Sequence, residues 1–232
     1  SGAVFQFDLQ GHHVGDLIEA VLEVVQVGVL GNLGIDAGLE NKFCAHRRTA
    51  YLAVHFHHVD AALGQRTAAA GWMAGGGIEG GKIKTLLGGG ISQATTTTFN
   101  AIFFAGLEDV YHKPHSLYFS RYPVGREATL DWVSVDMKFR NDSPYGVVLQ
   151  AGTTGKVGQQ GSVTVKVWST KRYTIKSSAP VRSNYRAPGK TVYDDSAGCK
   201  PQSAMTGFDV KFYRLFYEGK KLVRKEPFSW RY

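Results

Sequence analysis

The sequence has little of what defines several common protein classes. Its 232 residues include only two cysteines, Cys44 and Cys199, which lie far apart and form no CxxC pair. This usage gives neither a zinc site nor a disulfide framework, and a single Cys44–Cys199 bond would require an oxidising compartment. The sequence also contains no run of eighteen or more apolar residues, so we expect no segment of it to span a bilayer.

The chain also lacks the usual features of a translation start. It opens with Ser1 and Gly2, without an initiator Met and without the basic stretch that begins a signal peptide. We therefore expect the chain to be a fragment or a processed product, with any membrane anchor lying outside it.

Acidic residues are scarce after the first 60 positions. Residues 1–60 hold three Lys/Arg against seven Asp/Glu, about −4, which leaves about +12 for the remainder of the net +8. A basic surface suits an anionic partner such as wall teichoic acid or acidic lipid headgroups, because neutralising a polyanion releases its counterions. No helix-turn-helix, zinc-finger or RNA-binding pattern is present, so we expect no nucleic-acid partner.

Residues 1–61 differ from the rest of the chain in composition and in hydrophobic pattern. Six of the eight histidines lie there, and the apolar residues follow no steady period. We interpret this segment as atypical: a separate small domain, a partly disordered stretch, or the product of a shifted reading frame. His55 and His57 would share one face of a strand, where His46 or His12 could complete a metal site. The alternative is a compositional accident, and we expect no metal.

After residue 61 the sequence predicts one well-marked helix. The triple glycine Gly88–Gly90 leads into a segment whose apolar side carries Phe99 and Phe103. Ser92 stands where an N-cap is expected, and Gly106 lies near a natural helix end. The sequence therefore predicts a helix that begins directly after a glycine-rich loop.

Most of the remaining chain predicts antiparallel strands. Alternation over residues 129–140, with Val133 on the apolar side, predicts a half-buried strand and a hairpin spanning residues 129–151. Another strand is expected at residues 162–169, and a last hairpin turns at residues 218–220. The predicted fold class is α+β, with mostly antiparallel strands and hairpins and one helix.

Aromatic residues interleave with Lys and Arg along these predicted strands. Such a pattern suits stacking on sugars or contact with an anionic polymer. Cross-strand aromatic pairs that stabilise the sheet are the alternative. The residues concerned are Trp132, Trp168, Tyr213, Phe216, Tyr217 and Trp230.

Several spaced motifs occur in a fixed order. GGGISQATTTTFNA at residues 88–101 is followed by HKPHS at 112–116 and GREAT at 125–129. This series resembles the VanW family, whose members show a triple glycine, Cys or Ser before Gln, a Ser/Thr run ending in an aromatic-Asn pair, a His-Ser pair and a Gly-x-Asp-Ala-Thr segment. ALGQRTAAAGW at 62–72 is similar to the family's approach to this motif, and GCKPQSAMTGFDVKFYR at 198–214 is similar to the tail of actinobacterial-type members.

The resemblance covers roughly residues 62–232 and shows two departures. Glu127 stands where the family more often has Asp, and residues 1–60 lack the family's upstream strands and its Pro-Gly-Glu-x-Phe-Ser-like segment. We accordingly divide the chain into an atypical segment at 1–61, a VanW-like core at 62–152 and a β-rich extension at 153–232.

What the resemblance implies is a bacterial cell-envelope protein of undetermined activity. Family members are extracytoplasmic and often membrane-anchored in their full length, with peptidoglycan-binding-type domains ahead of this one. The resemblance does not supply a reaction, and we expect no cofactor.

The glycine-rich helix start is the first candidate binding site. Glycines let backbone N–H groups approach a ligand closely, and the helix dipole favours negative charge there. We expect a carboxylate, such as the C-terminus of a peptidoglycan stem peptide, to bind at this loop and at the 112–116 segment. The candidate ligand-binding residues are Gly88, Gly89, Gly90, Gln93, Thr95, Thr96, Asn100, His112 and Ser116. The alternative is that the glycines only permit a tight loop and that Ser92 only caps the helix.

Ser92 is also a candidate catalytic nucleophile, with His115 or His112 as its base and nearby backbone N–H groups as the oxyanion hole. Family members with Cys at this place favour the idea, because a helix N-terminus lowers the pKa of a thiol. No third member of a triad can be identified, which argues against it.

Three functional hypotheses therefore stay open. The first is a module that recognises peptidoglycan or another anionic wall polymer. The second is a serine-dependent hydrolase or transferase that acts on amide or ester bonds of the cell wall. The third is a structural β-module.

Overall fold

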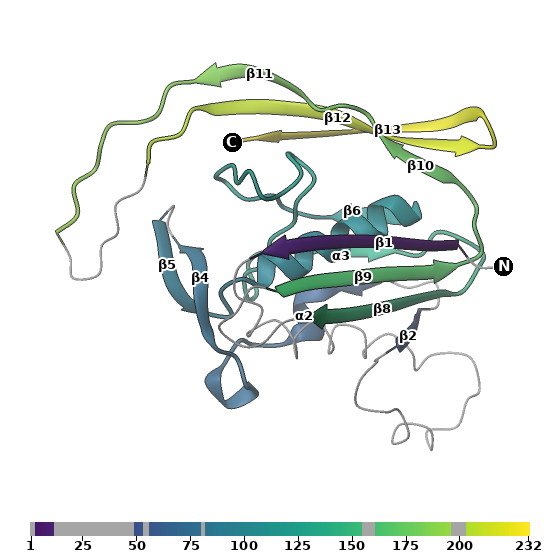
Figure 1. Ribbon diagram of the computed structural model, residues 1–232, viewed down its shortest axis with the longest axis horizontal. Helices are drawn as coiled ribbons and strands as arrows, with labels where there is room; N and C mark the ends of the chain where they lie inside the picture. The colour runs from purple at the N-terminus through teal and green to yellow at the C-terminus, as the bar shows by residue number, and fades with distance from the viewer. Residues whose placement is uncertain (1–2, 12–48, 53–55, 80–81, 155–160, 196–202) are drawn as a thin grey trace.

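The computed structural model describes residues 3–11, 49–52, 56–79, 82–154, 161–195 and 203–232 (Figure 1). The predicted α+β class is confirmed, since antiparallel strands dominate and α3 is the one long helix of the described residues. The short helices are α2 (Val59–Leu63) and the 3-10 turn η2 (Ala68–Ala70). No helix in the described ranges is long and apolar enough to cross a membrane.

The first large sheet, which we call the N-terminal sheet, contains four antiparallel strands. Their spatial order is β1 (Ala3–Gly11), β9 (Gly161–Ser169), β8 (Val147–Thr154) and β2 (Thr49–Leu52). The predicted strand at residues 162–169 is therefore confirmed. Its alternate valines are buried, as the period of two requires.

The second large sheet, which we call the C-terminal sheet, is built around β12 (Gly207–Glu218). β13 (Lys221–Arg231) pairs with β12 along one edge. β10 (Thr174–Ser177) and β11 (Val181–Arg186) pair with β12 at its two ends, so they occupy the opposite edge. The predicted final hairpin is confirmed, and Gly219 turns it with a left-handed φ of 57°.

Two smaller sheets complete the fold. β3 (Phe56–His58), β7 (Lys138–Arg140) and β6 (Glu108–Tyr111) form a three-stranded sheet. β4 (Ala74–Glu79) and β5 (Lys82–Leu87) form a two-stranded ribbon, which Figure 1 shows beside the two large sheets.

The helix α3 (Ile91–Ala105) lies in the core between the two large sheets. It packs against β1 and β9, and the ring of Phe103 lies 6.3 Å from that of Phe212 on β12 and 5.4 Å from that of Phe228 on β13. Every residue from Gln93 to Phe103 is buried. The helix is therefore enclosed on nearly all sides, and its predicted apolar side is only part of the buried surface.

Three threonines of this helix satisfy their own hydroxyl groups. Thr95, Thr97 and Thr98 each donate to the carbonyl four residues earlier, at 3.0, 2.7 and 2.9 Å. A buried hydroxyl without a partner would cost free energy. These local bonds let a helix rich in threonine enter the core.

The ends of α3 confirm one prediction and correct another. Gly106 is the C-cap, with a left-handed φ of 76°. Gly90, not Ser92, is the N-cap, because a left-handed φ of 89° at Gly90 turns the chain into the helix. Ser92 therefore lies within the first turn, and the prediction that it caps the helix is wrong.

The predicted hairpin at residues 129–151 is also wrong. Residues 129–137 hold one isolated bridge around a turn, and β7 pairs with β3 and β6 whereas β8 pairs with β9 and β2. The cause is two carboxylates. Asp136 accepts the N–H groups of Asp60 and Met137, and Asp60 accepts that of Val133, which holds Val133 at a φ of 69° and leaves it 82% exposed.

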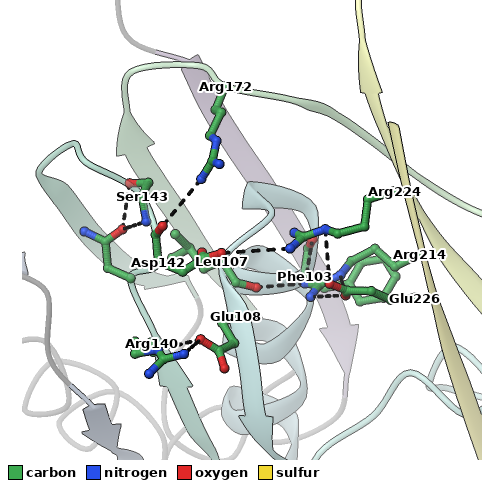
Figure 2. A network of polar contacts seen from close by, with 11 residues as sticks. Phe103, Leu107, Glu108, Arg140, Asp142, Ser143, Arg172, Arg214, Arg224 and Glu226 are labelled. Carbon is green, nitrogen blue, oxygen red and sulfur yellow. Dashed lines mark hydrogen bonds and ion pairs between the residues drawn. The ribbon is translucent and has the colours of Figure 1, made fainter. Parts of the chain in front are cut away.

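Arg214 of β12 joins the C-terminal sheet to the end of α3 (Figure 2). The residue is 1% exposed, and its guanidinium donates to the carbonyls of Leu107, at 2.9 Å, and Phe103, at 3.4 Å. Its Nε donates to Glu226 at 2.8 Å. A cation is favoured there because the C-terminal end of a helix carries the negative end of its dipole. Burial lowers the pKa of Arg214, against the opposing effect of Glu226.

The N-terminal segment contributes β1, β2 and β3. Residues 12–48, 53–55 and 196–202 lie outside the described residues. The hypotheses on a His55 metal site with His46 or His12, and on a Cys44–Cys199 bond, fall there. The division at residues 61 and 152 stays a prediction.

Candidate functional site

The triple glycine forms a tight turn between β5 and α3. Gly88 has a φ of 72°, a conformation that side chains rarely adopt. A Cβ on Gly89 would lie 2.1 Å from the carbonyl oxygen of Gly75 on β4. Gly88 is buried and Gly90 is exposed. The backbone conformation and the approach to β4 thus account for these glycines, and Gly90 is the member that a ligand can reach.

The threonine-rich motif is hydrogen-bonded to the GREAT motif. The Thr96 hydroxyl donates to the carbonyl of Ala128 and accepts from its N–H, both at 3.1 Å. Asn100 donates to the carbonyl of Arg126 at 2.9 Å and to that of Thr96 at 2.8 Å, and its Oδ1 accepts from Nε of Arg126 at 2.8 Å. Thr96 and Asn100 are fully buried. The two motifs, about 30 residues apart in the sequence, therefore form one hydrogen-bonded unit in the core.

The accessible part of the predicted ligand-binding set is small. Thr95 and Gln93 are buried within α3, as are Thr96 and Asn100. Ser92 is half-buried, and Ser116 is exposed. A ligand could therefore touch Gly90, Ser92 and Ser116, but it would reach the buried side chains only after α3 moved.

His115 is held by a buried carboxylate. Its Nδ1 lies 2.6 Å from Oε2 of Glu127, a residue with no exposed surface. Tyr232 donates its hydroxyl to the other oxygen of Glu127 and accepts the N–H of Gly125 at 2.8 Å. Burial, with help from Glu127, raises the pKa of Tyr232. The ring of Tyr122 stacks on His115 at 5.2 Å between centroids, so the histidine has a fixed orientation.

His112 has a separate carboxylate partner. Its Nδ1 lies 2.7 Å from Oδ2 of Asp109, and its ring stacks on Phe99 of α3 at 4.1 Å between centroids. Within the part of the chain that the structure describes, no hydrogen bond joins Ser92 to either histidine. The structure thus brings His115 together with Glu127, and His112 with Asp109, but it shows no assembled nucleophile and base.

Sequence reasoning missed the role of Glu127. We noted it only as a departure from the family pattern, although a carboxylate twelve positions after a histidine carries no periodic signal that would pair the two. Among the described residues, no group of three or more His, Cys, Asp or Glu could hold a metal ion.

The aromatic residues interleaved with cations divide between core and surface. Phe216 is buried, whereas Trp132, Trp168 and Tyr213 are exposed. On the C-terminal sheet, Nζ of Lys225 lies 3.7 Å from the ring centroid of Tyr213, and Nζ of Lys176 lies 5.2 Å from that of Tyr217. These two pairs lie on the sheet face opposite the core.

Comparison with known proteins shows a family likeness over part of the chain. Residues 55–168 match the family model described as VanW like protein. The chain is also similar to the uncharacterized protein YoaR of Bacillus subtilis (strain 168), with 32% identity over 108 residues, which are 47% of this chain and 34% of YoaR. The chain thus spans about a third of the length of that relative. No solved structure gives a significant match.

The matched region contains the three motifs on which the resemblance was based, and it ends within β9. Residues 169–232, with the whole C-terminal sheet, lie beyond it, so the likeness of residues 198–214 to actinobacterial-type tails stays a prediction. Through residues 55–168, just under half of its length, this chain is similar to the VanW-like family.

Proposed function

We propose that this chain is a non-catalytic module of the bacterial cell envelope that binds the wall, through peptidoglycan or an anionic polymer attached to it. The observation that carries the proposal is the strong positive charge of a VanW-like chain, about +12 after residue 60. A cation-rich surface favours binding to a polyanion because counterions are released.

The buried residues of the motif serve the fold and leave few positions for a ligand. Thr96 and Asn100 use their polar atoms to hold α3 to the 126–128 segment, so the motif stabilises the fold. Stem-peptide recognition would use the accessible positions Gly90, Ser92 and Ser116 at the start of α3 and in the following loop.

One observation favours the alternative function, a serine-dependent hydrolase or transferase. A carboxylate that holds Nδ1 of a histidine is the arrangement that fixes the tautomer of the base in hydrolase triads, and Glu127 holds His115 in this way. This alternative requires Ser92 to approach Nε2 of His115 when a substrate binds.

One experiment separates the functions. The purified chain, as wild type and as Ser92→Ala, is incubated with bacterial sacculi; protein left in the supernatant is measured, and muropeptides are analysed by mass spectrometry. The proposal predicts that wild type leaves the supernatant, that Ser92→Ala also does so with at most a graded loss of affinity, and that the muropeptides are unchanged with both proteins. New muropeptides with wild type alone would establish the enzyme. If the protein neither binds the sacculi nor changes the muropeptides, the binding module and the enzyme are both contradicted, and the structural β-module is left.

A further inference from the structure

The outward face of the C-terminal sheet is defined by its register. Along β12 the side chains of Phe212, Arg214 and Phe216 are buried, so the alternate residues point away from the core. The pairing places Ser229, Pro227, Lys225 and Leu222 of β13 beside these outward residues, and Lys176 of β10 beside Leu215. We call this surface the basic face; its cations and aromatic rings are Lys176, Lys211, Tyr213, Tyr217, Lys225 and Arg231.

Two lysines of the basic face are oriented by tyrosine rings. The ammonium groups of Lys225 and Lys176 lie over Tyr213 and Tyr217. A cation–π contact at an exposed site contributes only about 0.5–1 kcal/mol. It nevertheless holds the charge on the sheet, so less side-chain entropy is lost when an anion binds.

Carboxylates do not compensate these charges. From Lys211 to Tyr217, neither the outward residues of β12 nor their β13 partners include an acid. The acid of the face, Asp209, accepts hydrogen bonds from Asn184, Arg186 and Arg231, which lower its pKa. Arg231 is 74% exposed in its side chain. The basic face therefore presents net positive charge to solvent.

The cations follow the direction of the strands. Outward residues on one strand recur roughly every 7 Å, so the row from the Asp209–Arg231 pair to the Leu215–Lys225 pair extends about 20 Å. Lys176 and Lys225 stand on strands that flank β12, roughly 10 Å apart. A linear ligand with regularly spaced anionic groups matches this row better than a compact anion does.

From this geometry we infer that the basic face binds a linear phosphodiester polymer of the cell wall, of the teichoic acid class, whose phosphates contact the lysines and whose sugar or polyol units contact the tyrosines. The inference rests on the proposed function and names its site and its ligand class. Phosphate is the repeating anion, and rings such as Tyr213 offer an apolar surface for the units between phosphates.

A membrane surface is the less suitable occupant. The exposed aliphatic residues of these strands lie apart. Val181 pairs with Lys211 on one edge of β12, whereas Leu222, next to the exposed Val223, pairs with Tyr217 on the other edge and at the other end. They form no joint patch that could enter the acyl boundary, as stable anchoring requires.

The test compares two triple variants of the full chain. Lys176→Gln, Lys211→Gln and Lys225→Gln remove charge from the basic face, and Lys166→Gln, Lys171→Gln and Lys190→Gln remove the same charge elsewhere. Sedimentation is measured with native sacculi that carry teichoic acid and with the same sacculi after hydrofluoric acid has removed the phosphodiester polymer. Purified poly(glycerol phosphate), phosphatidylglycerol vesicles and duplex DNA serve as soluble probes. Thermal unfolding of each variant verifies its fold.

We expect wild type and the control triple to bind native sacculi and poly(glycerol phosphate), and to lose most sacculus binding after acid treatment. The face triple should bind at least about tenfold more weakly at low salt, and its salt slope should fall by about two.

Three results would overturn the inference. Equal binding of native and stripped sacculi, unaffected by the face triple, would contradict the inference and leave the proposed function standing. Wild type that stays in the supernatant with both kinds of sacculi would contradict the proposed function itself. Binding to vesicles or DNA as tight as to poly(glycerol phosphate) would show a surface for polyanions in general.

Discussion

Replacing Asn100 by alanine should destabilise the protein without any ligand being present. The side chain has no exposed surface, and it makes three hydrogen bonds, one of them to the Arg126 guanidinium. Burial already lowers the pKa of Arg126. Water therefore cannot fully replace the Asn100 oxygen that accepts from its Nε. Two neutral bonds and one charge-assisted bond correspond to a loss of about 3–4 kcal/mol.

The assay is urea and thermal unfolding of Asn100→Ala beside Ser92→Ala. For a chain of this size the loss corresponds to a fall in Tm of about 10 °C. Ser92 is half-buried and its side chain makes no hydrogen bond among the described residues, so its variant should stay within about 0.5 kcal/mol of wild type. If Asn100→Ala unfolds within about 2 °C of wild type, the motif does not hold α3 in place, and its residues would have to be explained by a ligand instead.

Further predictions concern packing, charge and pH, and urea unfolding measures each one. Gly89→Ala should cost about 2–3 kcal/mol, because the new Cβ would meet a carbonyl oxygen at 2.1 Å, whereas Gly146→Ala, with open space around it, should be nearly neutral; equal effects would contradict the tight turn. Arg214→Met should cost about 2–3 kcal/mol, because it removes the donor to the Leu107 carbonyl and the shorter of the two ion pairs of Glu226, which keeps only Arg224 at 3.3 Å. The exposed Arg231→Met should cost below about 1 kcal/mol, and the reverse order would refute the role given to Arg214. Burial raises the pKa of Tyr122 from 10.0 to about 12, so its contribution is complete below pH 10 and is lost as the pH rises towards 12. Tyr122→Phe should remove this part of the alkaline loss, and an unchanged profile would contradict the assignment.

Local sequence signals predicted the elements whose partners are close in the chain. Three local features predicted α3: the glycine-rich turn before it, the helical period of its apolar residues, and Gly106 at its end. The last hairpin needed only two alternating strands around Gly219. Each of these signals is complete within about 25 residues, so no knowledge of the remaining fold was needed.

Long-range pairing was not predictable in this way. The alternation at residues 129–140 has the period of a strand, but Asp60 and Asp136 capture the backbone N–H groups that a ladder would use. Asp60, which accepts the N–H of Val133, lies more than 70 positions away in the sequence. Hydrophobic periodicity cannot predict such a contact. The second strand of that hairpin is present as β8, but it pairs with β9 and β2, which local periodicity does not identify as its partners.

The candidate site was predictable in its residues but not in their roles. The motif spacing identified the segments around Thr96, His115 and Glu127, and the structure brings them against α3. Polar residues in a recognisable motif look like ligand contacts in a sequence. Complete burial shows instead that Thr96 and Asn100 serve the fold, which only the packing of α3 between two sheets could reveal.

The most direct test of the central claim is sedimentation of the wild-type chain with native, teichoic-acid-bearing sacculi, with muropeptides measured in the same sample. A non-catalytic wall-binding module predicts that the protein moves to the pellet and that the muropeptide profile does not change. Binding through the basic face predicts in addition that added poly(glycerol phosphate) returns the protein to the supernatant. Protein that stays in the supernatant, or new muropeptides in the wild-type sample, would contradict the account.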